Sequence, residues 1–263
     1  MKNQPLITVA VPSFNQGRYL AVALKSIFSQ DIPVEVFVLD GGSTDNSLEI
    51  IKSWEPRLAG WRSEKDEGQA AAVNEGICRG TAPYVCWLNS DDYYLPEGLR
   101  TLVNALDSAP EAPAAYGKSW NVNVRGEKIK PYWTAPFSRR HLANRCFVSQ
   151  PATLIRRSAW ESAGGLDESL RMAFDYDLWW RLFLEHGPLL YVNRFVAANR
   201  RHDDTKTTIN RNQHYKEAMM LVKRYYGRIP LKWYLARPVM VEMWLFVQKM
   251  KKRGNRFRGK EGG

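Results

Sequence analysis

Short hydrophobic runs and amphipathic stretches alternate through the first hundred residues of the chain. The apolar runs at 6–13 and 34–40 are each followed by a segment with apolar positions at helical spacing, RYLAVALKSIFSQ and NSLEIIKSW. Apolar residues at every third or fourth position indicate an amphipathic helix, and a short apolar run bounded by turn residues indicates a buried strand. The alternation therefore predicts an α/β fold with a mostly parallel sheet covered by helices.

The same pattern continues for one more unit and then changes. AGWRSEKD is a predicted short strand, GQAAAVNEGICRG a helix, APYVCWLNS a central buried strand and PEGLRTLVNALDSAP another helix. Beyond it, AAYGKSWNVNVRGEKI has the pattern of a hairpin, CFVSQPATLIRRS that of a loop and YDLWWRLFLEHG that of an aromatic helix. We predict a parallel α/β half at 1–110, an α+β half at 111–227 and a C-terminal helical segment at 228–263.

Polar residues follow the predicted strands in VPSFNQG, LDGGSTDNS and LNSDD. Because ligands bind beyond the carboxyl ends of strands in open α/β sheets, these three segments should line one crevice. In the second segment, Thr44, Asp45 or Asn46 can cap the next helix, and Asp45 is the expected cap. That leaves Asp40 at the strand tip free to face a ligand.

Two adjacent carboxylates, Asp91 and Asp92, end the central strand. Such a pair is costly unless a cation neutralises it, and oxygen ligands of this kind suit Mg²⁺ or Mn²⁺ held jointly with the phosphates of a substrate. A sugar nucleotide would supply those phosphates. No GxGxxG follows the first strand and no GxxxxGK[ST] occurs, so hydride transfer and P-loop chemistry are not favoured. The alternative is a turn-capping role before Pro96.

Together, VPSFNQGRYLAVALKSIFSQ, VFVLDGGSTDNSLEII, SEKDEGQAAAVNEGI and YVCWLNSDDYYLPEGL resemble the family 2 glycosyltransferases, over about residues 6–205. The resemblance implies a GT-A fold, in which Asp40 reads the nucleotide base and NSDD is the Asp-x-Asp metal motif, with Asn89 where many members have the first Asp. Asp91 and Asp92 are then the candidate metal ligands. It implies these donor-binding residues: Pro12, Phe14, Asn15, Asp40, Gly41, Ser43, Asp66, Gly68, Gln69, Asn74, Asn89, Ser90, Asp91 and His202.

The segment SQPATLIRRSAWESAGGLDESLRMAFDYDLWWRL resembles the acceptor side of the same family, where an Asp acts as general base. The matching residue is Asp175. Phe174 stands where many relatives have a Glu, and an apolar neighbour should raise the pKa of the Asp175 carboxyl. Asp177 is expected to cap a helix starting at Leu178, and Trp179 and Trp180 are expected in the core and the cleft wall.

The resemblance implies an inverting, metal-dependent enzyme, whose first half, 1–110, binds the nucleotide sugar and whose second half, 111–227, binds the acceptor. It would move a single sugar from a nucleoside-diphosphate sugar to a hydroxyl of a saccharide or lipid-linked saccharide, in bacterial surface polysaccharide synthesis. UDP and dTDP sugars are the favoured donors, and a guanine nucleotide is compatible with the same residues. One rival is a sugar nucleotidyltransferase, of whose glycine-rich loop VPSFNQG is a poor version. Another is a nucleic-acid binder, suggested by the pI of 9.6. It is disfavoured, because the basic residues concentrate in a short tail without interleaved aromatics.

The charge of the chain, +11 overall, bears on partners. Residues 249–263 carry seven Lys or Arg against one Glu, directly after the apolar WYLARPVMVEMWLFV. The pairing predicts attachment to an anionic membrane surface, with Trp233 and Trp244 at the headgroup level. A solvated tail, packing on the catalytic domain and contact with a second copy of the chain are the alternatives.

Location is predicted from what the sequence lacks. MKNQPLITVAVPS has no signal-peptide pattern, and no window has the roughly 18 uninterrupted apolar residues of a spanning helix. Cys78, Cys86 and Cys146 have no CxxC spacing and are expected to be buried, reduced thiols. These features predict a cytoplasmic protein, peripheral on the inner face of the membrane.

Overall fold

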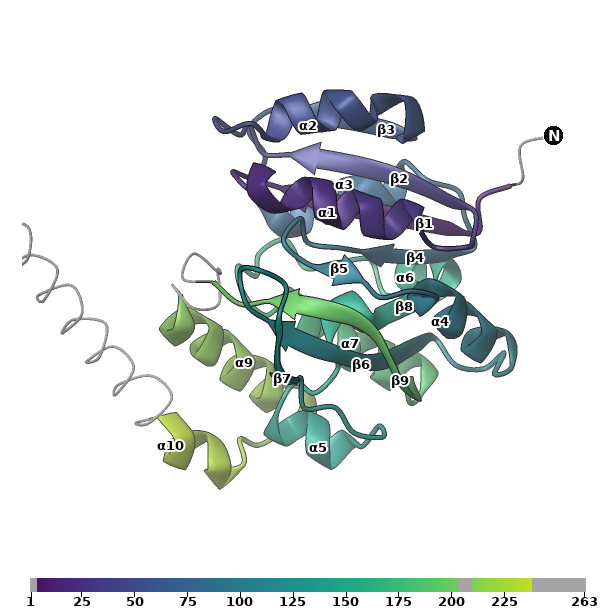
Figure 1. Cartoon of the computed structure of the whole chain (residues 1–263). Coiled ribbons are helices and arrows are strands. Elements are labelled where there is room, and N and C mark those ends of the chain that lie inside the picture. The colour runs from purple at the N-terminus through teal and green to yellow at the C-terminus, as the bar shows by residue number, and fades with distance from the viewer. Residues whose placement is uncertain (1–3, 203–209, 238–263) are drawn as a thin grey trace, which may run out of the picture.

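The computed structural model describes residues 4–202 and 210–237 and contains, among them, a nine-stranded mixed sheet with helices packed against it (Figure 1). The strand order is β3-β2-β1-β4-β8-β6-β9-β5, with β7 paired to β6. The strands are β1 (Ile7–Ser13), β2 (Val34–Asp40), β3 (Gly60–Ser63), β4 (Tyr84–Trp87), β5 (Tyr93–Tyr94), β6 (Ala114–Val122), β7 (Lys128–Pro131), β8 (Thr153–Arg156) and β9 (Leu190–Arg200). The α-helices are α1 (Gly17–Phe28), α2 (Ser47–Trp54), α3 (Gln69–Cys78), α4 (Gly98–Asp107), α5 (Arg139–Asn144), α6 (Arg157–Ser162), α7 (Phe174–His186), α9 (Arg211–Tyr226) and α10 (Leu231–Arg237).

The first half has the predicted parallel βα arrangement. β1 pairs in parallel with β2 on one side and with β4 on the other, and β2 pairs with β3. In this register Ser13 lies beside Asp40, and Asp40 lies beside Ser63. Because parallel strands end at one edge of the sheet, the loops that follow β1, β2 and β4 meet there, as the sequence predicts.

The second half extends the same sheet by antiparallel pairing. β8 lies between β4 and β6 and is antiparallel to both, while β9 runs parallel to β6. The expected hairpin is confirmed as β6 and β7. The expected loop around CFVSQPATLIRRS is wrong in part, because Thr153–Arg156 forms β8. Four residues are too few to show the alternation of apolar and polar positions that identifies a strand. The two strands that flank β8 supply its backbone partners.

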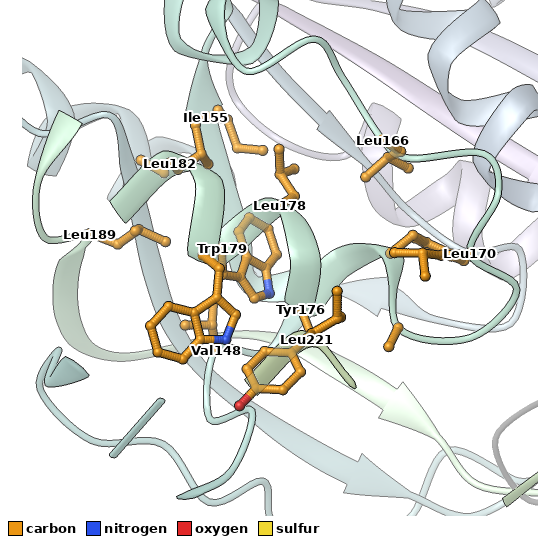
Figure 2. Close-up of a cluster of buried hydrophobic side chains, with 14 of the residues drawn as sticks. Val148, Ile155, Leu166, Leu170, Tyr176, Leu178, Trp179, Leu182, Leu189 and Leu221 are labelled. Atoms are coloured by element: carbon orange, nitrogen blue, oxygen red, sulfur yellow. The ribbon is translucent and has the colours of Figure 1, made fainter. Parts of the chain in front are cut away.

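A large aromatic and aliphatic cluster fills the space between the sheet and α7 (Figure 2). Trp179 and Trp180 are fully buried in it, and the ring of Trp179 stacks on that of Trp87 with centroids 6.0 Å apart. The expectation that both tryptophans belong to the core is confirmed. Their burial fixes the rotation of α7, and with it the position of the acidic residues in the first turn of that helix.

Two expectations about single residues are wrong. α7 starts at Phe174 and not at Leu178, so Asp177 lies inside the first turns, where it accepts hydrogen bonds from Arg181 Nε at 2.7 Å and Tyr225 Oη at 2.6 Å. Its side chain ties α7 to α9 and caps no helix. Cys78 is exposed, while Cys86 is buried and Cys146 is partly buried. Cys78 ends α3, where the helical face turns toward solvent.

The described part of the C-terminal segment packs on the protein. Trp233 is 8% exposed, its Nε1 donates to the carbonyl of Ala143 at 2.7 Å, and its ring makes an edge contact with Tyr215. Trp233 is therefore not at a membrane headgroup level, because it fills a site between α5 and α9. Residues 238–263, with Trp244 and the basic tail, lie outside the described residues. Within the described residues, no helix combines the length and the apolar character needed to cross a bilayer.

Candidate active site

Hydrogen bonds join the loops that follow β1 and β2. Asn15 has a φ of 50°, in the left-handed region that asparagine tolerates better than most residues. This conformation lets its Oδ1 accept from the backbone amide of Thr44 at 2.8 Å, while the backbone amide of Asn15 donates to Ser43 Oγ at 2.7 Å. Two of the predicted donor-site residues, Asn15 and Ser43, are thus in direct contact.

The Asp45 carboxylate accepts from the first backbone amide of two helices, whose N-cap residues are Gln16 and Asn46, so Asp45 has a structural role as expected. Its Oδ2 accepts from the amide of Gly17 at the start of α1, and its Oδ1 accepts from the amide and hydroxyl of Ser47 at the start of α2. Burial raises the pKa of this carboxyl, but these hydrogen bonds outweigh the burial and leave the pKa below its ordinary value. These hydrogen bonds hold both loops in place beside the sheet edge.

Asp40 is not free to face a ligand, contrary to expectation. The residue is fully buried, and its carboxylate accepts from Ser43 N at 2.9 Å, Ser43 Oγ at 2.5 Å and Ser63 Oγ at 2.8 Å. A buried carboxylate needs such donors, and the register of the strands places Ser63 directly beside Asp40. In this structure Asp40 organises the loop that starts at Gly41, and its role in reading a base stays a prediction.

The Gly41 and Asp66 positions lie close together. A Cβ added at Gly41 would come within 3.2 Å of Asp66 Oδ2 and 3.4 Å of the Phe14 ring. Asp66 Oδ1 accepts from the amide of Gly68, whose φ of 120° suits glycine. Phe14 is 59% exposed beside them. The structure therefore brings four of the predicted donor-site residues together: Phe14, Gly41, Asp66 and Gly68. Pro12, in β1, and Ser90, in the loop after β4, are buried.

A chain of side-chain amides connects α3 to the end of β4. Gln69 Nε2 donates to Asn89 Oδ1 at 2.7 Å, and Asn89 Nδ2 lies 3.3 Å from Asp92 Oδ2 and 3.2 Å from Gln150 Oε1. Gln150, which the sequence analysis did not identify as a site residue, holds this series of amides in place by donating from Nε2 to the carbonyl of Trp87 at 2.7 Å. Asn89 replaces an acid of the usual motif, and its amide gives Asp92 a donor that a carboxylate could not.

The two adjacent carboxylates have different surroundings. Asp92 is buried and accepts from the backbone amide of Arg200 at 2.8 Å. Burial, and then the negative charge of Asp91, raise the pKa of Asp92 well above its ordinary value. Asp91 is partly exposed, and its Oδ2 lies 2.9 Å from His202 Nε2. His202, which the resemblance implies as a donor-binding residue, thus contacts the acidic motif directly.

Tyr19 and two arginines complete this cluster, and no motif in the sequence marks Tyr19 as a site residue. The ring of Tyr19 lies 5.3 Å from the His202 ring, with the guanidinium carbons of Arg18 and Arg200 at 4.5 and 4.6 Å from its centroid. Arg200 Nε also donates to the carbonyl of Asp91. Basic groups of this kind beside a carboxylate pair are suited to a bound diphosphate.

The chemistry of Asp91 and His202 fits a divalent cation. Their side chains present one carboxylate oxygen and one imidazole nitrogen 2.9 Å apart, and both atom types ligate Mn²⁺ and related ions. The described residues contain no group of three or more His, Cys, Asp or Glu placed to hold a metal. A cation here would therefore need ligands from outside these residues, which phosphate oxygens and water provide.

Asp175 lies in the first turn of α7, away from the acidic pair in sequence and in surroundings. Its Oδ1 accepts from the amide of Tyr176 at 2.8 Å. Burial raises the pKa of the Asp175 carboxyl to about 6. The expected rise of the Asp175 pKa is thus present, and its cause is burial of the carboxyl. The neighbouring Phe174 is itself buried in the core.

Asn74 does not join the donor-site cluster. Its Nδ2 donates to the carbonyl of Leu166 at 2.9 Å and to Glu168 Oε1 at 2.7 Å, and its Oδ1 accepts from the amide of Leu166 at 2.8 Å. These contacts use the polar atoms of the side chain to join α3 to the segment before α7. Asn74 therefore has a structural role in this fold, and its binding of the donor stays a prediction.

Comparisons with known proteins agree with this architecture. Chondroitin synthase from Escherichia coli is 26% identical over 249 residues, which cover 91% of this chain and 35% of that protein. Hyaluronan synthase from Pasteurella multocida is 26% identical over 219 residues, covering 80% of this chain and 22% of that protein. The chain spans about a third or less of the length of these relatives.

Solved structures show the same fold. S. aureus TarS in complex with UDP-GlcNAc superposes with a TM-score of 0.68 at 18% identity, covering 90% of this chain and 70% of that one. The mannosyltransferase PcManGT from Pyrobaculum calidifontis, in complex with GDP-Man and Mn²⁺, gives a TM-score of 0.65 at 18% identity, covering 92% of this chain and 73% of that one. The glycosyl transferase family 2 model matches residues 8–163. The chain belongs to glycosyltransferase family 2 and has the GT-A fold.

Proposed function

We propose that this glycosyltransferase is inverting and metal-dependent, and that it moves a single sugar from a nucleoside-diphosphate sugar to a hydroxyl group of a saccharide or lipid-linked saccharide. UDP and dTDP sugars are the favoured donors. The observation that carries the proposal is the separation of two acidic sites with different chemistry. One is the contact of Asp91, in the loop after β4, with His202, and the other is the partly buried Asp175 in α7, whose carboxyl has a raised pKa.

Asp175 has the properties of a general base. A carboxylate with a pKa of about 6 is ionised at neutral pH and is a stronger proton acceptor than an ordinary aspartate. In the proposed reaction, the acceptor hydroxyl transfers its proton to Asp175 as its oxygen bonds to the anomeric carbon. The bond from that carbon to the diphosphate breaks at the same time, and its electron pair leaves with the nucleoside diphosphate. A single displacement of this kind inverts the anomeric configuration.

The other acidic site would assist the leaving group. Asp91 and His202 would hold a Mn²⁺ or Mg²⁺ ion, which supplies positive charge to the departing diphosphate when bound. Asp92 would keep Asp91 in place, since its own oxygens accept from Arg200 and Asn89. Arg18 and Arg200, which flank Tyr19, would add positive charge beside the same phosphates.

The similar structures and the curated relatives support these substrate classes. The two solved structures hold UDP-GlcNAc and GDP-Man, the second with Mn²⁺. The curated relatives are synthases of chondroitin and hyaluronan. We infer a saccharide acceptor from these names, for synthesis of a bacterial surface polysaccharide.

Calorimetry on the purified full chain tests the proposal. UDP, dTDP and GDP sugars are titrated in MnCl₂ and again in EDTA, and release of nucleoside diphosphate is followed with each. We expect at least one sugar nucleotide to bind in Mn²⁺ and to lose most of its affinity in EDTA. Asp91→Asn should reduce the Mn²⁺-dependent affinity, and Asp31→Asn, which neutralises an exposed carboxyl before β2, should not. Equal affinity in EDTA and Mn²⁺ would contradict the metal assignment.

A further inference from the structure

We propose that α5 and α10 together form a surface that docks on an anionic lipid bilayer. We call it the α5–α10 surface and define it by Leu231, Tyr234, Leu235, Arg139, Arg140, Arg228 and Lys232. The inference is independent of the proposed donor and acceptor. It concerns where the enzyme is held and not which sugar it transfers.

The orientation of α10 is fixed by one residue. Trp233 is held by its hydrogen bond to Ala143 in α5, by the hydrogen bond that its carbonyl accepts from Tyr215 Oη at 2.6 Å, and by the edge contact with the Tyr215 ring. Successive residues of a helix are rotated by about 100°, so residues 231, 234 and 235 share the face opposite residue 233. The burial of Trp233 therefore turns that face away from the protein.

The face that points away is apolar. Leu231 is 70% exposed, Tyr234 53% and Leu235 68%. The other large exposed apolar residues of the described chain are spread over several elements, whereas these three lie within five residues of one helix. Two leucines and a tyrosine on one helical stripe match the composition of an interfacial helix, which inserts its apolar side between lipid headgroups.

Basic residues border this stripe. Lys232 lies in α10 and Arg228 just before it, and both are exposed. Arg139 and Arg140 are exposed in α5, which lies beside α10 in Figure 1 and accepts the Trp233 hydrogen bond. The guanidinium of Arg139 is held over the ring of Tyr226 at 5.3 Å, so its position is set by the end of α9.

The charge of the surface is of one sign. The segments 138–146 and 228–237 contain no Asp or Glu. A surface with an apolar stripe bordered only by cations is complementary to a leaflet rich in anionic lipid, and a protein partner would need a similarly continuous acidic rim. The sequence after 237 continues with PVMVEMWLFVQKM and the basic tail, so the chain that leaves this surface has the same apolar and basic character.

Co-flotation with vesicles tests the proposal on the full chain. Vesicles of phosphatidylglycerol and phosphatidylcholine are compared with phosphatidylcholine alone, at low and high salt. We expect binding to the anionic vesicles that weakens in high salt. Leu231→Ser/Leu235→Ser should weaken it by at least about tenfold, because two exposed leucines no longer enter the interface. Arg140→Gln/Lys232→Gln should also weaken it by about tenfold, and only at low salt.

Matched variants separate this surface from general effects. Val22→Ser/Leu184→Ser removes exposed apolar groups from α1 and α7, and Lys25→Gln/Lys52→Gln removes exposed charges from α1 and α2. Both control variants should bind vesicles like the parent chain. The proposal is overturned if the α5–α10 variants bind as well as their controls, since the tail alone would then account for attachment. It is also overturned if Leu231→Ser/Leu235→Ser abolishes a dimer seen by light scattering and leaves vesicle binding unchanged.

Discussion

The acidic residues in the loop after β4 and the acidic residue at the start of α7 show two ways of holding a carboxylate in this fold. At β4, Asp91 contacts His202, and Asp92 accepts from Arg200 and Asn89, so each carboxylate has a partner from another element. At α7, Asp175 accepts from the amide of its own neighbour, Tyr176. The difference is that the first site is bound into a network and the second is mainly desolvated.

This difference determines what each site can do. A network that joins α3, β4, β9 and the segment before β8 keeps the acidic pair in a fixed geometry, which a cation and a diphosphate require. A desolvated carboxylate is held less tightly by partners, and burial favours its protonated form, so it can accept a proton near neutral pH. Under the proposed function, fixed charge and proton transfer would belong to separate parts of the molecule.

Replacing the base should give the largest effect. Asp175→Asn removes the proton acceptor but keeps the size of the side chain, so we expect turnover to fall by about 10² to 10⁴. Donor affinity by calorimetry should change little, because the network at β4 is untouched. Glu185→Gln, which neutralises a carboxyl near the other end of α7, is the control and should keep normal turnover. A loss of donor affinity with unchanged turnover at saturation would place Asp175 in the donor site.

Substitution of His202, which contacts Asp91, should produce a smaller and opposite pattern. We expect His202→Gln to lower the Mn²⁺-dependent affinity for the donor by about 10- to 100-fold, because a ligand-type nitrogen is lost beside Asp91. His186→Gln, at the exposed end of α7, is the control and should have no effect. If His202→Gln reduces turnover while Mn²⁺-dependent affinity stays normal, the division between the two sites is wrong.

The smallest expected effect is the change that Asp175→Asn makes to the free energy of unfolding, and this change should depend on pH. The pKa of Asp175 is about 6 in the fold and near 3.8 in an ordinary setting. A raised pKa means that the fold favours the protonated carboxyl, so its stabilising contribution is complete below about pH 4 and is lost as the pH rises through 6. Asn does not ionise.

Asp175→Asn should therefore raise the free energy of unfolding by roughly 1 to 3 kcal/mol at pH 7.5 and leave it nearly unchanged at pH 4. Urea denaturation at the two pH values measures the difference. Asp31→Asn, at an exposed position, should show no such dependence. An equal gain in the free energy of unfolding at both pH values would mean that ionisation of the Asp175 carboxyl does not destabilise the fold.

The elements of the first half and the order of its motifs could be predicted from the amino-acid pattern alone. Apolar runs of strand length and helical spacing carry enough periodic signal to identify β1, β2, α1 and α3, and parallel strands must end at one edge. Asp45 in a structural role and Trp179 as a core residue also followed from the sequence, because both depend on local context and burial preference.

The partners of the polar side chains could be identified only in the folded chain. The sequence left Asp40 free, yet the register of β2 and β3 sets Ser63 against it. Asn74 was expected at the donor site, yet its side chain joins α3 to Leu166, which lies 92 positions along the chain. Trp233 was expected at a membrane and fills a site between α5 and α9. Hydrogen-bond partners and exposure depend on which distant segments meet, and no local pattern in the sequence contains that information.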